Sequence, residues 1–340
     1  GALSRINRRW TIAGRPTARD VNESDFAMTE GEVRSPGAGE VLVQVDMLAF
    51  EPAMKGWMEN IGGYVARTEI GDMMRGSGIG TVLESRAPHL KVGEKVLGPF
   101  GWQEYATLPG DQFQSLEGEA HPSAQLDVLG VVGLTAYFGM KHVGRPFPGD
   151  TVVVTGAAGG VGAIVVQLAK IAGCRVIGIA GGAEKCAWLT GELGADAAID
   201  YKSRDIGAEL ARLAPDGADV VWDNVGGVIL NDILAHLALH ARVVICGGIS
   251  RSKTGGMPIG PANYFNLVFK RATMQGILLN DHEAEFPVAR KRLSQWLTEG
   301  RLIARQDIQE GFENAPRTLM RLFSGANTGK QLLRLRGEGQ

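Results

Sequence analysis

The sequence predicts an α/β protein in which a doubly wound parallel sheet is joined to a second, β-rich region. Three observations indicate this class. Between residues 151 and 189 a strand, a glycine turn, a helix, a strand and a helix follow one another. Further apolar segments of strand length alternate with helical sequence as far as residue 279. Before residue 125, short apolar strands separated by glycine and proline turns predominate.

The glycine turn at 156–162 predicts a dinucleotide site. Residues 152–154 are all valine, which suits a parallel strand covered on both faces, and we expect the helix to begin near Val161. Bare main-chain amides at a helix N-terminus can approach a pyrophosphate closely, and the helix dipole stabilises its charge. The residues expected to bind the cofactor here are Gly156, Ala158, Gly159, Gly160, Val161 and Gly162.

The spacing of these glycines is GxxGxxG and not GxGxxG, and alone it is a weak signal. Its setting strengthens the prediction, because an apolar helix and a second strand at 175–180 follow at the distance typical of a βαβ unit. A merely structural strand-turn-helix is the alternative.

The end of the second strand favours NADPH over NADH. An NAD-selective site commonly has an acidic residue there, whereas this chain continues with Gly181 and Gly182. Small residues leave room for a 2′-phosphate, and Lys185 can neutralise it. Glu184 could instead serve the ribose, but an acid in the first turn of the next helix usually stabilises the helix dipole. Lys185 could equally be a solvated helix lysine.

Composition excludes several classes of protein. The chain of 340 residues fits two domains, and 44% hydrophobic with 21% charged residues is ordinary for a globular protein. A formal net charge of −2 with no basic block gives no support to nucleic-acid binding. There is no apolar run of about 20 residues for a membrane span, and the N-terminus lacks the apolar core of a secretory signal. We therefore expect a cytoplasmic protein.

Cysteine and histidine positions predict no metal. Cys174, Cys186 and Cys246 cannot close a disulfide framework, which suits a reducing compartment, and they do not form a four-cysteine zinc lobe. No combination of cysteine, histidine and acid indicates a catalytic zinc site. Histidines in expected loops or helix ends are assigned solvated roles: His89, His121 and His142.

The remaining elements are assigned in chain order. Strands are expected in the first region at 40–50, 74–84, 93–99 and 102–108. Residues 75–80 resemble a second nucleotide motif, but strand sequence follows them, so we interpret them as a barrel bend. A helix at 126–142 leads into the nucleotide fold, whose later strands are expected at 197–200, 219–223, 242–245 and 274–279, completing six. The tail is assigned a helix at 283–299, a strand at 303–308, a helix at 313–323 and a strand at 331–335.

The whole chain resembles the medium-chain dehydrogenase/reductase superfamily. The resemblance is carried by the β-rich start, the returning tail, and the motifs AAGGVGAIVVQLAK, DNVGG and CGGIS. The most similar branch is the zinc-independent, NADPH-dependent enone and alkenal double-bond reductases, which include leukotriene/prostaglandin reductases and curcumin reductase-like proteins. The resemblance implies a Rossmann-like NADPH-binding domain at 126–310 and a partly open GroES-like barrel at 1–125, completed by 311–340.

The resemblance also implies further cofactor contacts. Lys185 and Tyr201 would surround the adenosine phosphate, and Asn224 with the CGGIS loop would follow the cofactor towards nicotinamide. Asn327 would reach it from the tail, and backbone groups near its carboxamide would come from 276–278. Besides the glycines already named, the expected contacts are therefore Gly181, Gly182, Lys185, Tyr201, Asn224, Cys246, Gly247, Gly248, Ile249, Ser250, Gly276, Ile277, Leu278 and Asn327. Turn-forming or half-buried roles are the alternatives for Tyr201, Asn224 and Asn327, and Cys246 is expected to be a buried small residue.

The substrate pocket departs from the family pattern. Relatives often have DPYMRGR and IYKR where this chain has residues 51–57 and 268–271, so two expected phenols are missing. Tyr64 is the candidate catalytic residue, because several relatives have a substrate-facing tyrosine there; an ordinary surface tyrosine is the alternative. The expected pocket residues are Met54, Trp57, Tyr264 and Phe269.

The predicted activity is hydride addition to the β-carbon of an α,β-unsaturated ketone or aldehyde, with NADPH as donor. Without zinc, a hydrogen-bond donor such as Tyr64 or a ribose hydroxyl must stabilise the enolate oxygen. The nearest alternative is an NADPH quinone reductase, and a noncatalytic NADPH-binding regulatory or structural protein is another. The expected partners are the small substrate and a second copy of the chain.

Overall fold

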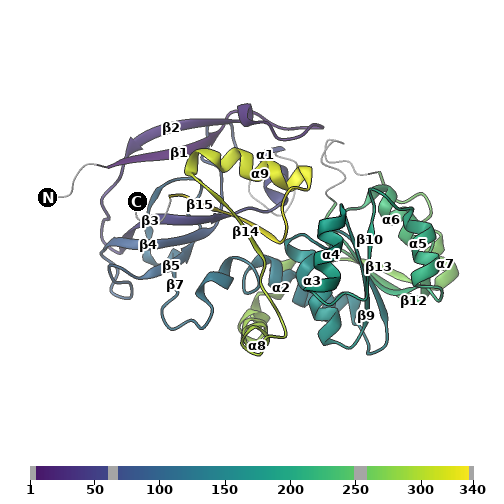
Figure 1. Ribbon diagram of the computed structural model, residues 1–340. Coiled ribbons are helices and arrows are strands. Elements are labelled where there is room, and N and C mark those ends of the chain that lie inside the picture. The colour runs from purple at the N-terminus through teal and green to yellow at the C-terminus, as the bar shows by residue number, and fades with distance from the viewer. Residues whose placement is uncertain (1–4, 60–67, 249–258, 337–340) are drawn as a thin grey trace. The chain divides into compact units, whose positions relative to one another are not determined.

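The structure is a computed structural model that describes residues 5–59, 68–248 and 259–336 (Figure 1). The chain divides into two compact units. The first contains Gly1–Leu126, Asp307–Ala326 and Gln331–Gln340, and the second contains Asp127–Gln306 and Asn327–Lys330. The second unit thus includes four tail residues that we had expected to lie with the rest of segment 311–340.

The second unit contains the predicted six-stranded parallel sheet. Its strands are β8 (Thr151–Val154), β9 (Arg175–Ala180), β10 (Ala197–Asp200), β11 (Ala218–Asp223), β12 (Leu237–Ile245) and β13 (Thr273–Gly276). The order is β10-β9-β8-β11-β12-β13, so the direction of winding reverses between β8 and β11. A ligand crevice is expected outside the carboxyl ends of the strands at such a reversal.

Helices cover both faces of this sheet, as parallel strands require. On one side lie α3 and α4, and on the other lie α5 and α6 (Figure 1). Burial of Val153, Val221 and Val243 against Ile206 and Ile233 forms the core beneath α5 and α6. The helices of the unit are α2 (Val131–Gly139), α3 (Gly160–Ile171), α4 (Ala183–Gly191), α5 (Ile206–Leu213), α6 (Gly227–Leu234), α7 (Asn266–Lys270) and α8 (Phe286–Thr298).

Where one helix was expected at 126–142, the structure has three shorter helical segments. A 3-10 turn, η3 (Pro122–Leu126), precedes α2, and a π-helical turn, η4 (Met140–Gly144), follows it. The helix expected at 283–299 likewise begins as η6 (Leu279–Glu285) before α8. Among the described residues of the chain, no helix is long and apolar enough to cross a membrane.

The first unit is β-rich, as predicted. Its main sheet has the order β14-β15-β3-β4-β5-β7, with β6 also paired to β3. These strands are β3 (Glu40–Ala49), β4 (Gly78–Ser85), β5 (Lys95–Gly98), β6 (Tyr105–Pro109), β7 (Gln114–Ser115), β14 (Gln306–Glu310) and β15 (Lys330–Arg334). The glycines of 75–80 do lead into a strand, and a Cβ at Gly78 would lie 2.1 Å from the Met47 carbonyl oxygen of β3. Close strand approach therefore explains that motif.

Several elements of the first unit were not expected from the sequence. They are the hairpin of β1 (Ile6–Ile12) and β2 (Phe26–Glu32), the helix α1 (Ala53–Glu59), and the 3-10 turns η1 (Glu23–Asp25) and η2 (Gly110–Gln112). The predicted tail helix is present as η7 (Phe312–Asn314) followed by α9 (Ala315–Ser324). A shared core of residues such as Phe50, Trp102 and Phe312 holds these elements together.

Candidate coenzyme site

In the glycine turn between β8 and α3, the main chain of Gly159 and Gly162 lies close to the carbonyl group of Gly156. Gly156 has φ +56°, a conformation that favours glycine, and the Gly159 amide donates to the Gly156 carbonyl at 3.1 Å. A Cβ at Gly162 would lie 2.1 Å from that same carbonyl oxygen. No larger residue fits at Gly162 unless the turn moves.

The N-terminus of α3 is open for an anion. Gly159 is the N-cap, no side chain caps the helix, and its first turn has no acidic residue. The free amides and the positive end of the dipole are therefore not neutralised by the protein's own side chains. Gly160, Val161 and Gly162 begin the helix here, and Ala158, which is buried, precedes its N-cap.

The tail segment Asn327–Lys330 lies beside this turn. Gly329 donates its amide to the Ala158 carbonyl at 2.7 Å and forms a parallel bridge with Gly159. Asn327 is buried, and its Nδ2 donates to the Gly329 carbonyl at 3.0 Å. The structure thus brings Asn327 into the unit that contains the turn, as a side chain that orders the tail loop.

A buried carboxylate organises the carboxyl end of β11. Asp223 Oδ1 accepts from Thr155 Oγ1 at 2.9 Å and from the amides of Val225 and Gly226 at 3.2 Å. Burial raises the pKa of Asp223, although these hydrogen bonds oppose the shift. The Asn224 amide side chain donates to the Thr155 carbonyl at 2.8 Å. These bonds join the strand ends of β8 and β11.

The loop after β12 is anchored to the same point. The amides of Cys246 and Gly247 donate to the Asp223 carbonyl at 3.0 and 3.3 Å. Burial, reinforced by the nearby Asp223 charge, raises the pKa of the Cys246 thiol to about 12. The thiol is therefore protonated at neutral pH, which does not favour a nucleophile, and the residue is half-buried where a buried one was expected. Gly248 ends the described part of this loop, and Ile249 and Ser250 lie outside the described residues.

The end of β9 carries two glycines under two side chains. A Cβ at Gly181 would lie 2.9 Å from both the Tyr201 hydroxyl oxygen and Lys202 Cε. Gly182, at φ +102°, precedes α4, in which Lys185 is half-buried and Glu184 is exposed in the first turn. Tyr201 and Lys202 thus border the place where the adenosine ribose was predicted.

An acid does lie near this strand end, but it comes from the neighbouring strand. Asp200 ends β10, and its Oδ1 accepts from the amides of Gly182 at 2.9 Å and Lys202 at 3.0 Å. These hydrogen bonds lower the pKa of Asp200. The carboxylate oxygen is committed to holding the glycine pair and the Lys202 main chain.

The expected carboxamide contacts follow the last strand of the sheet. Gly276 ends β13 and is exposed, and the Ile277 amide donates to the Ile245 carbonyl at 3.1 Å. Leu278 precedes η6. The predicted contact residues from β8, β9, β11, β12 and β13 therefore all lie at or beyond the carboxyl ends of parallel strands, which meet at one edge of the sheet.

The chain matches two sequence patterns of known oxidoreductases. Residues 8–116 match the pattern described as the N-terminal domain of oxidoreductase, and residues 160–295 match the pattern described as zinc-binding dehydrogenase. NADPH-dependent curcumin reductase of Escherichia coli is 38% identical over 99% of both chains. The NADP(+)-dependent 2-alkenal reductase of Nicotiana tabacum is 36% identical over 95% of this chain and 94% of its own length.

A solved structure agrees with these relatives. CurA of Vibrio vulnificus in complex with NADPH superposes with a TM-score of 0.91 at 35% identity, covering 97% of this chain and 99% of its own. This chain belongs to the enone reductase branch of the medium-chain dehydrogenase/reductase superfamily. The predicted family and fold class are confirmed.

The residues predicted to line the substrate pocket have different environments. In the first unit, Met54 is fully buried in the core, so it presents no surface to a substrate, and Trp57 is half-buried with the Arg75 guanidinium 6.0 Å from its ring centroid. In the second unit, Tyr264 and Phe269 are each 62% exposed. Tyr64 lies outside the described residues.

The sequence analysis of the reductase missed Thr155, Asp200, Lys202 and Asp223. Thr155 immediately follows a parallel strand, Asp200 and Asp223 each end one, and Lys202 lies two residues beyond the end of β10. That position at the carboxyl end of a strand was the available signal. Their hydrogen bonds join residues far apart in sequence, such as Thr155 with Asp223, so the partners could not be assigned from the chain alone.

Proposed function

We propose that the chain binds NADPH and reduces the carbon-carbon double bond of α,β-unsaturated ketones or aldehydes, without zinc. The observation that carries the proposal is the uncapped, acid-free N-terminus of α3 behind a turn in which Gly162 has no room for a Cβ. This cradle fits a diphosphate bound by main-chain amides. The names of relatives that match nearly the full chain supply the reaction class.

NADPH fits the end of β9 better than NADH. We assign the 2′-phosphate to Lys185, Tyr201 and Lys202, of which the last two border Gly181. Asp200, the acid that ends β10, uses one carboxylate oxygen for the amides of Gly182 and Lys202, which supports a role in loop geometry and not in holding a ribose diol.

The protein's part in the reaction is to hold the reactants and stabilise oxyanion charge. Bound NADPH supplies a hydride to the β-carbon of the substrate. Negative charge then develops on the carbonyl oxygen, and one well-placed donor in such a site is worth roughly 3 kcal/mol. We propose Tyr64 as this donor, with Met54, Trp57, Tyr264 and Phe269 as candidate pocket residues. The assignment of Met54 requires its buried side chain to become accessible.

The positions of the cysteines support zinc independence of the reaction. Cys174, Cys186 and Cys246 are free thiols. Among the described residues, the side chains close enough together to hold a metal ion are His142, His282 and Glu285, and this group includes no cysteine.

An NADPH-oxidation screen across enones of graded size, with mass analysis of the products, tests the proposal. We expect loss of NADPH absorbance and a product two hydrogens heavier, saturated at the alkene. Oxidation of NADPH by quinones with the enone alkene left intact would indicate a quinone reductase instead. Tight NADPH binding without turnover of any enone or quinone would indicate a noncatalytic protein.

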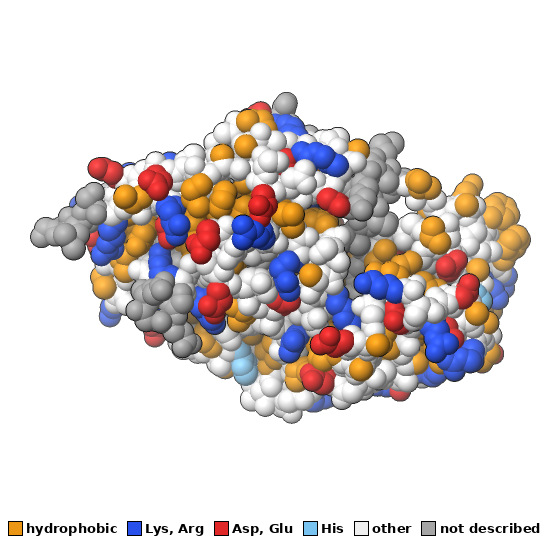
Figure 2. All heavy atoms as spheres, turned by 45° about the horizontal axis from the view of Figure 1, so that its top comes forward, with side chains coloured by type: hydrophobic (Ala, Val, Ile, Leu, Met, Phe, Trp, Pro, Cys, Tyr) orange, Lys and Arg blue, Asp and Glu red, His pale blue; other side chains and the backbone are white. Residues whose placement is uncertain are grey.

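We further propose that the protein is a homodimer in the cytoplasm. β13 is an edge strand, and next to it in sequence the helix α7 exposes Val268 (56%) and Phe269 (62%). Hydrophobic side chains are visible at the end of the molecule where α6 and α7 lie (Figure 2). An exposed edge with adjacent apolar residues is a typical pairing surface. The three free cysteines suit a reducing compartment.

Light scattering after gel filtration tests the dimer. Val268→Glu should shift the protein towards monomer, whereas Val92→Glu, at a 68% exposed site in the first unit, should not. A monomeric unmodified protein would exclude the dimer. Cell fractionation tests the location, and recovery outside the cytoplasm would contradict it.

A further inference from the structure

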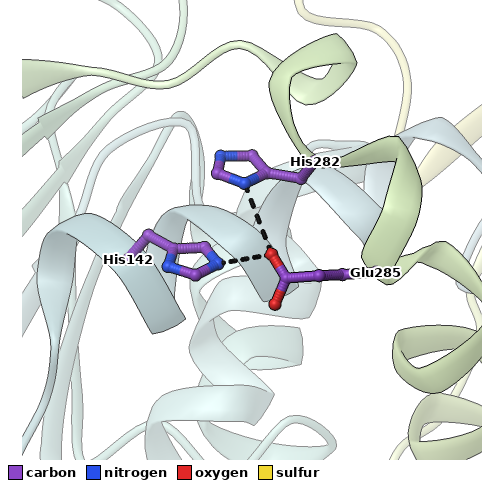
Figure 3. Close-up of side chains that lie close together, drawn as sticks. All are labelled: His142, His282 and Glu285. Carbon is purple, nitrogen blue, oxygen red and sulfur yellow. Dashed lines mark hydrogen bonds and ion pairs between the residues drawn. The ribbon is translucent and has the colours of Figure 1, made fainter.

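Three metal-ligating side chains converge in the second unit (Figure 3). His142 comes from η4, and His282 and Glu285 come from η6. Their side chains are 35%, 19% and 37% exposed, so the group is reachable from solvent and partly shielded by protein. His142 is exposed, as the predicted solvated role requires, and it also contacts the Glu285 carboxylate. The cluster could not be predicted from the sequence because His142 is 143 residues from Glu285.

The ligand atoms already have nearly the separations of a coordination shell. Glu285 Oε2 lies 3.0 Å from His142 Nε2 and 3.6 Å from His282 Nδ1. Bonds of ~2.0–2.2 Å at tetrahedral angles place neighbouring zinc ligands about 3.3 Å apart. All three ligand atoms lie within 4.8 Å of one another, so the two nitrogens need approach by at most about 1.5 Å to complete the set.

Aromatic packing holds the two imidazoles in place. Their rings stack with centroids 4.5 Å apart and an interplanar angle of 5°, and Phe138 stacks on the His282 ring at 5.1 Å. A metal lies near the plane of each imidazole that binds it, so binding requires one ring to turn from this parallel arrangement. The movement is a side-chain rotation and leaves η4 and η6 in place.

The carboxylate is oriented by a separate partner. Lys141 Nζ donates to Glu285 Oε1 at 2.8 Å, and the other oxygen, Oε2, faces both histidines. A hydrogen-bonded carboxylate with its second oxygen directed at the ion is the usual outer-shell arrangement in metal sites. Lys141 thus belongs to the support of the site and is not a ligand.

We propose that His142, His282 and Glu285 bind one divalent transition-metal ion, with zinc as the best fit and water completing the shell. Two imidazoles and a carboxylate suit zinc, copper, nickel or iron, whereas calcium and magnesium prefer oxygen ligands throughout. Within the described ranges 5–59, 68–248 and 259–336, this is the group that has metal-ligand geometry. The ion would join η4 to η6 and thereby stabilise the packing of α2 near α8.

Zinc titration of tag-free protein, treated with a chelator and then dialysed, tests the proposal by calorimetry. We expect one equivalent to bind at pH 7.5 and binding to weaken at pH 5.5, because imidazole must lose its proton to ligate. Zinc should also raise the melting temperature of the unmodified protein. Cobalt should bind at the same place and give visible absorption bands.

Variants decide whether the binding is at this cluster. His142→Phe and His282→Phe keep an aromatic ring in the stack and remove one ligand each, and Glu285→Gln leaves both rings intact should a ring substitution loosen the fold. Each should weaken zinc binding by at least about tenfold. The control is His240→Asn, because His240 is exposed and its φ of +61° is well tolerated by asparagine. The proposal would be overturned if the unmodified protein showed no saturable zinc binding. It would also be overturned if all three cluster variants bound zinc as tightly as the unmodified protein.

Discussion

Replacing Gly162 by alanine tests the coenzyme cradle most directly. The new Cβ would lie 2.1 Å from the Gly156 carbonyl oxygen and 2.9 Å from Ala157 Cα. Real Cβ atoms essentially never come closer than 3.0 Å, so the turn must retreat by about 0.9 Å. Both neighbouring atoms are main chain, and the clash cannot be relieved by rotating a side chain.

The retreat moves the amides that we expect to bind the diphosphate. A hydrogen bond to a charged group contributes about 1.5–3 kcal/mol, and a misplacement of about 1 Å can cost about 100-fold in a positioned site. Loss of one such bond predicts that the dissociation constant for NADPH rises about 10- to 100-fold. Quenching of protein fluorescence on titration with NADPH measures this constant.

Gly191→Ala provides a matched control for this experiment. Gly191 is also helical, at the end of α4, and a Cβ there meets nothing within 4 Å. Both substitutions add one methyl group and both raise helix propensity by about 1 kcal/mol, so only the clash distinguishes them. NADPH affinity within about threefold of the unmodified protein in Gly162→Ala would refute the cradle. An equal loss of NADPH affinity in Gly162→Ala and Gly191→Ala would also refute the cradle.

Three further predictions concern charge and proton donors. Lys185→Ala and Lys202→Ala should each reduce the preference for NADPH over NADH in steady-state kinetics by about tenfold or more, because each removes a cation from the 2′-phosphate. Equal use of both coenzymes by the unmodified protein would contradict this prediction. Tyr64→Phe should lower turnover by up to about 100-fold while leaving the dissociation constant for NADPH unchanged, and unchanged turnover would remove Tyr64 from the reaction. Burial raises the pKa of Asp223 above its ordinary value of 3.8, so the folded state binds more protons than the unfolded state. The contribution of Asp223 to stability therefore falls as the pH rises from the ordinary pKa of the carboxyl group through its raised pKa. Asp223→Asn keeps the Oδ1 acceptor and removes the charge, so melting temperatures should show a smaller decline above pH 4 than in the unmodified protein; parallel pH profiles would contradict the assignment.

The nucleotide fold could be predicted because local signals there agree with the tertiary structure. The valines of β8 and the glycines after it have strong conformational preferences, and the predicted strand at 197–200 matches β10. The hairpin of β1 and β2 was missed because β1 contains Arg8, Arg9 and Asn7, which weaken its apolar alternation. Its strand pairing and the Trp10 contact with Phe312 come from residues distant in sequence.

The sequence alone determined that a bare glycine turn precedes a helix, because glycine is the residue that permits φ +56° at Gly156 and close approach at Gly162. Tertiary structure decided which side chains share an environment. It tied Asp200 to Gly182, placed Asn327 beside the turn, and brought His142 to Glu285. The physical reason is that backbone conformation depends on near neighbours, whereas a hydrogen-bond partner is set by the packing of the whole sheet and its helices.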